Sequence, residues 1–308
     1  MKFSILTPTH NRADVLAFAI RSVMAQTETD WELFIVGDGC TDNTAAVVAE
    51  FNDPRIRWLD LPKGPGFGYR NRNLAFRQMR GHYVALLGHD DIWLPDHLAL
   101  LSRRLEQSGA EWAYSRPIWG EPGGTLLPGD FDLATDAAKR KKFMEGKLNG
   151  IPASCVMHRR DCFARYGYWN ETLPEWGDFD MWVRIVAGTG CLGYLSTPTC
   201  LHFRANWRKI SNVTSRLMGC PDLLCELPAL RLPPGRNDQE SAWSCITKDP
   251  DWITSLRLEV DRADELLDEK AKHRLTTIYH HLSRRFSPLR LRSDFLLRQR
   301  FPDGKFFR

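Results

Sequence analysis

The chain has 308 residues, of which 43% are hydrophobic and 26% are charged, and its formal net charge is +4. This composition excludes a disordered chain. No apolar run reaches the roughly 20 residues of a membrane-spanning helix. The apolar stretch at the start of the chain is too short for a secretory signal. The eight cysteines form no CxxC pair, so we expect free thiols in a reducing compartment, and neither a zinc site nor a disulfide framework.

The first third of the chain alternates between strand-like and helix-like patterns. In chain order, we predict a strand at 2–8, a helix at 13–26, a strand at 31–36, a helix from Asp42 or Asn43 to about residue 51, a strand at 55–61, a Gly/Pro loop at 63–68, a helix at about 70–80, a strand at 82–87 and a helix from Pro95 to about residue 107. Strands that alternate with helices form βαβ units. We therefore predict an α/β fold with a Rossmann-like, mostly parallel sheet flanked by helices.

The rest of the chain is less regular. We predict short strands at 112–119, 154–158 and 191–195, a short helix at 161–166, a helix at 178–186, and a surface helix or loop at 131–148 that carries a basic run at 139–142. The proline-rich stretch 221–234 indicates a linker, and 251–285 indicates one or two amphipathic helices.

Polar clusters follow three of the predicted strands, at Thr7–Arg12, Asp38–Asp42 and His89–Asp91. The carboxyl ends of parallel strands meet at one edge of a sheet, and ligands of such sheets bind there. We therefore expect these clusters to converge on one site, although they lie far apart in the sequence.

The pair Asp90 and Asp91 follows a strand that reads as buried. Two carboxylates at a strand end can hold Mg²⁺ or Mn²⁺ while a diphosphate supplies further oxygens. A solvated turn with a helix cap is the alternative interpretation. His202 can ligate the same metal or steady a departing diphosphate, although a lone histidine is more often a structural residue.

Asp38 ends the second strand, where its carboxylate can accept the imide N–H of uracil or thymine; the alternative is a turn aspartate. Arg70 and Arg72 follow the Gly/Pro loop and can approach a base or a phosphate, or can lie on a solvated helix face. The loop itself matches neither a Walker A pattern nor a dinucleotide-binding motif.

Asp178 and Asp180 lie beside Trp176 and Trp182. A carboxylate near aromatic rings can act as a general base, and tryptophan rings are platforms for the faces of sugars. The alternative is that the two acids interact with the positive end of a helix and that the tryptophans belong to the core.

The order of these motifs is more specific than any one of them. The segments 4–12, 31–42, 68–73, 87–95, 154–184 and 202–211 resemble, in sequence order, the motifs of family 2 glycosyltransferases, which have the GT-A fold. The resemblance implies a GT-A domain at residues 1–211, followed by a linker and a basic, mostly helical extension at 212–308.

The resemblance also implies roles for the site residues. Thr7, Pro8, Thr9 and Asp38 would line the nucleobase pocket, with Arg12 and Arg70 or Arg72 nearby. Asp90 would contact ribose or metal, and Asp91 would hold Mn²⁺ or Mg²⁺ on the donor diphosphate, with His202 as a further candidate ligand. Asp178, with Asp180 as the fallback, would deprotonate an acceptor hydroxyl that attacks the sugar with inversion, the donor being a UDP- or dTDP-sugar.

Two glycines depart from the family pattern. Gly37 stands where the family usually has an aspartate, and Gly177 stands where a glutamate is expected. These departures keep open a second interpretation, an inactive protein that binds nucleotide sugars. A nucleotidyltransferase is a third, but the N-terminal region contains no basic nucleotide loop.

The charge of the chain is unevenly distributed. Residues 270–308 contain eleven Lys or Arg and two Asp or Glu, a charge of +9, whereas residues 1–269 carry −5. This basic tail, interleaved with apolar residues, predicts either a peripheral contact with an anionic membrane or a helix packed on the domain. We expect a cytoplasmic protein, with a peripheral location at the inner face of the membrane as the open alternative. We also expect a glycan or lipid-linked acceptor and no nucleic-acid partner.

Overall fold

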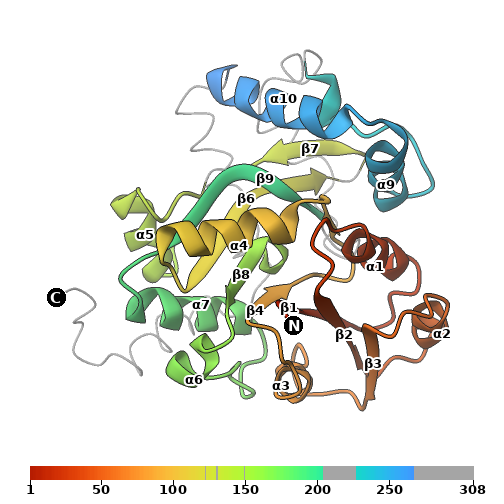
Figure 1. Ribbon diagram of the computed structural model, residues 1–308, viewed down its shortest axis with the longest axis vertical. Helices are drawn as coiled ribbons and strands as arrows, with labels where there is room; N and C mark the ends of the chain where they lie inside the picture. The colour runs from red at the N-terminus through yellow and green to blue at the C-terminus, as the bar shows by residue number, and fades with distance from the viewer. Residues whose placement is uncertain (122, 130, 149, 204–226, 267–308) are drawn as a thin grey trace.

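The computed structural model describes residues 1–121, 123–129, 131–148, 150–203 and 227–266 (Figure 1). Within these residues, nine strands form one sheet in the order β3-β2-β1-β4-β8-β6-β9-β5, and β7 pairs with β6. The strands are β1 (Phe3–Thr9), β2 (Trp31–Asp38), β3 (Ile56–Leu61), β4 (Tyr83–Leu86), β5 (Ile92–Trp93), β6 (Trp112–Glu121), β7 (Thr125–Pro128), β8 (Val156–Arg159) and β9 (Gly193–Phe203).

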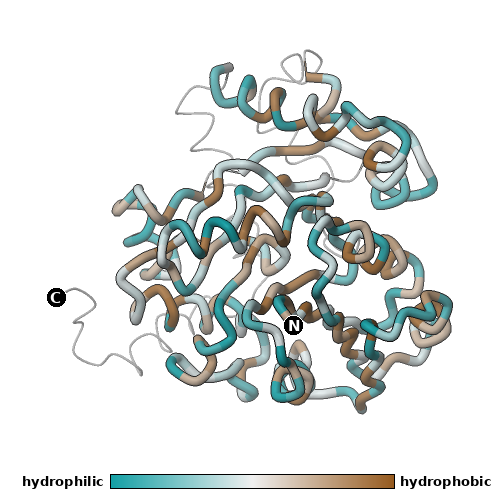
Figure 2. The backbone as a smooth tube through the Cα atoms, viewed as in Figure 1, coloured by the Kyte–Doolittle hydropathy of each residue, from teal (hydrophilic) through white to brown (hydrophobic). Residues whose placement is uncertain are grey.

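Helices cover both faces of this sheet. They are α1 (Leu16–Met24), α2 (Thr44–Ala49), α3 (Tyr69–Phe76), α4 (His97–Ser108), α5 (Ala137–Met144), α6 (Cys162–Tyr166), α7 (Gly177–Gly188), α9 (Asp238–Lys248) and α10 (Trp252–Leu266), with short 3₁₀ turns η1 (Ala153–Cys155) and η3 (Pro228–Leu230). Successive strand residues face opposite sides: Ile5 packs with α1 and α4, and Leu6 packs with α3 and α7. Figure 2 shows the hydrophobic residues along these inner strands.

The predicted fold class is confirmed. The strands β3, β2, β1 and β4 are all parallel, as the βαβ pattern predicts. The second half adds antiparallel pairs, because β6 and β7 are joined by the tight turn at Gly123 and Gly124 and because β8 runs against both β4 and β6.

One strand is longer than predicted. The pattern ends a strand at Leu195, before Ser196-Thr197-Pro198, but β9 continues to Phe203. Pro198 is tolerated because the register between β6 and β9 shifts at this point, and prolines occur in sheets at such irregularities. The continuation carries His202 into the sheet.

Residues 227–266 pack against the sheet. Leu230, Leu256 and Val260 are fully buried and share a hydrophobic cluster with Leu126 of β7 and Leu201 of β9. The predicted linker therefore includes a packed segment over 227–232, where Leu227 and Leu232 are also buried, whereas Pro233 and Pro234 are exposed. The predicted domain boundary at 211 lies outside the described residues, and it stays a prediction.

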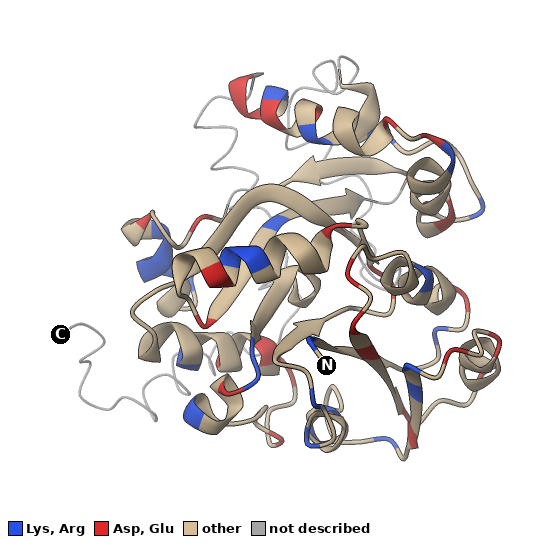
Figure 3. Ribbon diagram, viewed as in Figure 1, with Lys and Arg blue, Asp and Glu red and all other residues tan. Residues whose placement is uncertain are grey.

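The surface carries charges of both signs. Figure 3 shows acidic and basic residues along α4 and α10, whereas β7 and β9 carry none. The basic run 139–142 lies on α5, with Lys141 and Lys142 exposed. In the described part of the chain, no helix is both long and apolar enough to cross a bilayer. The basic tail, 270–308, lies outside the described residues.

Candidate active site

Asp91 is buried in the turn after β4 and is held from three sides. The backbone N–H of Phe203 donates to its Oδ1 at 2.9 Å, and His202 Nδ1 lies 2.9 Å from its Oδ2. The hydroxyl of Ser154 donates to the same Oδ2. Because β9 carries both His202 and Phe203, the long strand fixes the orientation of this carboxylate.

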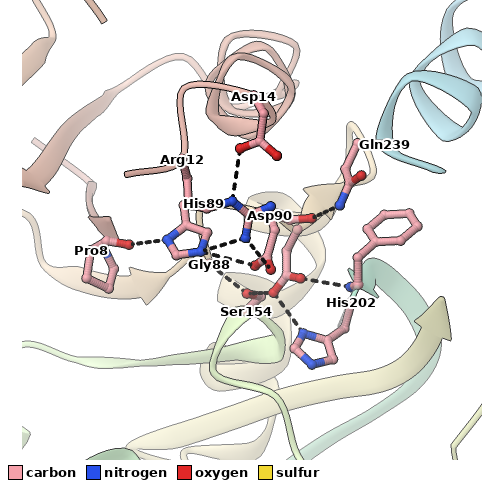
Figure 4. A network of polar contacts seen from close by, with 11 residues as sticks. Pro8, Arg12, Asp14, Gly88, His89, Asp90, Ser154, His202 and Gln239 are labelled. Carbon is pink, nitrogen blue, oxygen red and sulfur yellow. Dashed lines mark hydrogen bonds and ion pairs between the residues drawn. The ribbon is translucent and has the colours of Figure 1, made fainter. Parts of the chain in front are cut away.

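Asp90 points elsewhere, toward the end of β1 (Figure 4). Arg12 Nη1 lies 3.4 Å from its Oδ2, and His89 Nε2 lies 3.9 Å from its Oδ1. His89 Nδ1 also lies 3.1 Å from the carbonyl oxygen of Pro8. The polar clusters at 7–12 and 89–91 therefore meet, as the strand-end argument predicts.

Burial raises the pKa of Asp90, while the neighbouring His89 opposes this rise and the neighbouring Asp91 adds to it. Its side chain is 12% exposed, and its ion pairs are long. A buried carboxylate without a short ion pair is a favourable ligand for a cation. Its backbone oxygen accepts a hydrogen bond at 3.1 Å from Gln239 of α9.

Asp90, which has no short ion pair, has the oxygen chemistry that a hard divalent cation prefers. No group of three or more His, Cys, Asp and Glu is arranged to hold a metal within the described residues. Mg²⁺ and Mn²⁺ are commonly bound by one or two carboxylates together with water and substrate phosphates. Such a cation would be held by Asp90 and the remaining acceptor capacity of Asp91. Nδ1 of His202, the third predicted ligand, is turned to Asp91.

Asp38 ends β2 and is almost fully buried among donors of its own chain. Its Oδ1 accepts hydrogen bonds from the backbone of Gly64 and from the side chain of Asn71, each at 2.7 Å. Lys63 forms an ion pair with its Oδ2. Sequence reasoning missed Lys63 and Asn71, which belong to the Gly/Pro loop and the helix α3 that follow the neighbouring strand β3.

Thr7 and Thr9, at the end of β1, are also buried, and their hydroxyl groups have no hydrogen-bond partner among the described residues. Pro8 lies between them. The predicted pocket residues of β1 and β2 are therefore adjacent, since Pro8 pairs with Val36 in the sheet and His10 Nδ1 lies 2.8 Å from the carbonyl oxygen of Asp38.

Asp178 lies in the first turn of α7 and contacts two segments distant in sequence. Arg72 Nη1 donates to its two oxygens at 3.0 and 3.2 Å, and Trp169 Nε1 donates to Oδ1 at 2.7 Å. Asp180 instead pairs with Arg184 of the same helix at 3.1 Å. The structure thus gives the two candidate bases different partners.

The two arginines of α3 are also separated. Residues two apart lie on different faces of a helix, so Arg72 faces Asp178 while Arg70 is exposed to solvent. The alternative interpretation of a solvated helix face therefore describes Arg70. The nucleotide-binding role predicted for either arginine remains a prediction. Trp169 carried no signal in the sequence, because it lies in an irregular segment.

The two unexpected glycines have the same physical cause. A β-carbon at position 37 would lie 2.4 Å from the ring of Trp58, and one at position 177 would lie 2.5 Å from the ring of Tyr69. Neither distance is compatible with a side chain. An aromatic ring therefore occupies the space that the family's acidic residue would need at each position.

The model of Glycosyl transferase family 2 matches residues 4–167. This match spans more than half of the chain, and the chain belongs to this family. The fold is similar to that of Staphylococcus aureus TarS, residues 1–349, crystallised with UDP-GlcNAc, with a TM-score of 0.55 and 17% identity over 92% of this chain and 90% of that one. The GT-A type of fold is thereby confirmed.

Curated relatives are similar over parts of their length. The chain is 29% identical over 189 residues to an uncharacterized glycosyltransferase of Rickettsia felis, covering 59% of this chain and 31% of that protein. It is 32% identical over 111 residues to the UDP-Glc:alpha-D-GlcNAc-diphosphoundecaprenol beta-1,3-glucosyltransferase WfgD of Escherichia coli, covering 36% and 44%. It is 39% identical over 106 residues to the succinoglycan biosynthesis protein ExoO of Rhizobium meliloti, covering 34% and 30%. The matches thus span less than half the length of these relatives.

Proposed function

We propose that the protein is an inverting glycosyltransferase that moves a sugar from a UDP- or dTDP-sugar to a hydroxyl group of a glycan or lipid-linked acceptor. The observation that carries the proposal is the convergence of polar residues at the strand ends: Asp90 pairs with Arg12 and His89 contacts Pro8 at the end of β1, Asp91 follows Asp90 in the same turn, and Asp38 ends the neighbouring strand β2. The relatives' names, which include a glucosyltransferase for a diphosphoundecaprenol acceptor, support an envelope polysaccharide as the product.

In this proposal the nucleotide binds across the ends of β1 and β2. Thr7, Pro8, Thr9 and Asp38 surround the base, and an oxygen of Asp38 accepts the imide N–H. Because Lys63 pairs with Asp38 in the structure, the base and the ammonium group compete for the same carboxylate. Arg12 lies against Asp90 and would approach the donor from the side of β1.

A divalent cation bound at Asp90 and Asp91 would supply positive charge to the donor diphosphate. The chain's own contribution is to orient the two carboxylates. Ser154, His202 and Phe203 hold Asp91, and Gln239 holds the backbone of Asp90. His202 can therefore contribute to the site by orienting the carboxylate of Asp91.

Asp178 is the proposed general base. It would take the proton of the acceptor hydroxyl as the oxygen attacks the anomeric carbon from the face opposite the diphosphate, which inverts the configuration. Arg72 and Trp169 fix the direction of its carboxylate. A base is effective only when it lies within hydrogen-bond reach of the proton that it removes.

A screen of nucleotide sugars for hydrolysis, with and without Mn²⁺, tests the proposal. We expect hydrolysis of at least one UDP- or dTDP-sugar and a dependence on the metal. Isothermal titration with UDP and dTDP completes the test. Nucleotide binding without hydrolysis or transfer of any donor would support the inactive alternative instead.

We further propose that the protein acts in the cytoplasm at the inner face of the membrane. The support is the charge of +9 in residues 270–308, since basic segments are attracted to anionic lipids. Sedimentation with anionic liposomes checks this prediction. The full chain should sediment at low salt, and a chain that ends at Phe286 should sediment less. Equal sedimentation of the two chains would rule out the contact.

A further inference from the structure

Trp176, directly before α7, has an unusual backbone conformation. Its φ is 66° and its ψ is 18°, which is the left-handed region. Large side chains are strained there, and asparagine and glycine are the residues that tolerate it. The other non-glycine residues with positive φ in the described chain are Asn11 and Asn52. Trp176 is therefore the bulky exception.

Contacts on both sides hold this conformation in place. The backbone N–H of the next residue, Gly177, donates to the hydroxyl of Tyr69 at 2.8 Å. The carbonyl oxygen of Trp176 accepts from the N–H of Asp180 at 2.9 Å, which starts the helix. Tyr69 is buried, so the turn is tied to the core. Strain of this kind persists where the surrounding structure over-determines it, and it gathers at ligand-binding sites.

The segment before this turn approaches the loop that contacts Asp38. The carbonyl oxygens of Leu173 and Pro174 approach Gly66 so closely that a β-carbon there would lie within 2.9 Å of both. Gly66 belongs to the loop whose Lys63 and Gly64 contact Asp38. Trp176 thus lies two residues before Asp178, the proposed general base, and close to the loop that lines the proposed nucleobase pocket.

Trp176 keeps part of its surface exposed to solvent. The residue is half-buried, and the ring of Phe179 in α7 lies 6.4 Å from its ring at an interplanar angle of 80°. Trp182, the other tryptophan beside the acids, is 2% exposed and belongs to the core. Of these two tryptophans, Trp176 is the one that a ligand can reach.

We propose that Trp176 is the platform on which the acceptor's sugar ring stacks, so that a hydroxyl of that ring faces Asp178. This inference rests on the proposed glycosyltransferase function. A rigid indole presents a large apolar face at low entropic cost, and the apolar face of a hexopyranose complements it. If no side chain were needed at this position, glycine would adopt the conformation without strain. We explain the strained tryptophan by the use of its ring.

The test compares Trp176→Gly, Trp176→Phe and the wild type, with Asn52→Gly as the matched control that relieves a positive φ elsewhere. Binding of methyl hexopyranosides (glucoside, galactoside and N-acetylglucosaminide, in both anomers) is measured by saturation-transfer NMR with UDP and Mn²⁺ present. We expect Trp176→Gly to weaken binding of the preferred glycoside about tenfold or more, Trp176→Phe to retain most of it, and Asn52→Gly to bind like the wild type.

Thermal unfolding distinguishes the loss of the ligand-binding ring from a loss of folded structure. Glycine relieves the backbone strain but also removes the packing of the half-buried ring, so Trp176→Gly should still be folded at the assay temperature while it loses the glycoside. Unfolding of Trp176→Gly at that temperature, together with a loss of glycoside binding in Trp176→Phe equal to its loss of stability, would assign Trp176 a structural role and overturn the proposal, as would equal glycoside binding by wild type and Trp176→Gly, or no glycoside binding by the wild type.

The Michaelis constant for the donor in hydrolysis distinguishes the two sugars of the reaction. An increase in this constant for Trp176→Gly, with glycoside binding unchanged, would place the donor sugar on the ring and overturn the assignment to the acceptor. Because glycoside binding needs no turnover, loss of donor hydrolysis in the wild type would refute the proposed function without affecting the result for Trp176.

Discussion

The two acids at the start of α7 are distinguished by their partners. Asp178 is oriented by a residue of α3 and by Trp169, whereas Asp180 is paired with Arg184 one turn along the same helix. An aspartate that links separate segments around the site is placed to act on a ligand. An aspartate paired within its own helix mainly stabilises that helix.

We therefore expect Asp178→Asn to reduce sugar transfer by at least about a hundredfold, since an amide cannot accept the proton. The affinity for UDP, measured by isothermal titration, should change little. Asp180→Asn is the matched control and should retain most of the activity. The assignment is wrong if Asp178→Asn turns over at nearly the wild-type rate while Asp180→Asn does not.

Gly37 shows how packing between two elements restricts the type of residue at one position. In β2, Gly37 leaves room for the ring of Trp58 from β3. Overpacking of a filled site typically costs about 1–3 kcal/mol. A methyl group added at a position with open space around it costs little stability. The departure from the family pattern at this position is therefore a requirement of the neighbouring strand.

Gly37→Ala should lower the free energy of unfolding by about 1–3 kcal/mol, because the new methyl group meets this ring. Urea denaturation measures the change. Gly190→Ala is the control, because no atom lies within 4 Å of a β-carbon there and its φ is not positive. Trp58→Leu should remove most of the penalty in a double-mutant cycle, and an additive pair of substitutions would refute this explanation.

His97 links α4 to the long strand β9. It is fully buried, its Nδ1 lies 2.8 Å from the hydroxyl of Thr199, and its ring stacks on Trp93. Burial lowers the pKa of His97 from 6.5 to about 3, and the hydrogen bond to Thr199 opposes this shift. The unfolded chain therefore takes up a proton near pH 6.5 that the folded protein does not accept.

Stability from this residue is complete above pH 6.5 and is lost as the pH falls from 6.5 toward 3. Between pH 7 and pH 5 the loss amounts to about 2 kcal/mol. We expect His97→Gln to show a correspondingly smaller decrease in the free energy of unfolding over this range. His82→Gln, at an exposed histidine, should behave like the wild type. An unchanged pH dependence in His97→Gln would contradict the argument.

At the scale of the whole molecule, the helices α9 and α10 pack against the sheet. Arg116 of β6 is buried and donates two hydrogen bonds to Asp264 of α10, at 2.5 and 2.7 Å. Because the Arg116 side chain is only 6% exposed whereas that of Asp264 is 39% exposed, removing Asp264 would leave a buried guanidinium group without this carboxylate. From α9, Gln239 contacts the backbone of Asp90. Residues 227–266 therefore support both the core and the site.

A chain that ends at residue 211 should lose cooperative unfolding, because it exposes the apolar residues of β7 and β9 that Leu230, Leu256 and Val260 cover. Burying each such side chain stabilises the fold by about 1.5–3 kcal/mol. Circular dichroism during thermal denaturation compares this chain with the full one, and a cooperative transition of the shorter chain would support a domain boundary at 211.

Much of the architecture follows from local patterns. The alternation of strands and helices over residues 1–108 predicts the parallel part of the sheet, because periodicity reports which side chains face the core. The convergence of Asp38 and Asp90 follows from the geometry of parallel strands. The second half was less predictable, because its strands pair out of sequence order and β9 passes through a proline.

The amino-acid sequence alone was sufficient for the fold class, the family and the acids at the strand ends, since these depend on residue type, spacing and order along the chain. The tertiary structure decided which partner each acid has: Lys63 for Asp38, Ser154 and His202 for Asp91, and Arg72 for Asp178. It also decided that Trp176 is strained and only half-buried and that apolar residues of 227–266 pack against the sheet. These features arise from packing between distant segments, which no local pattern encodes.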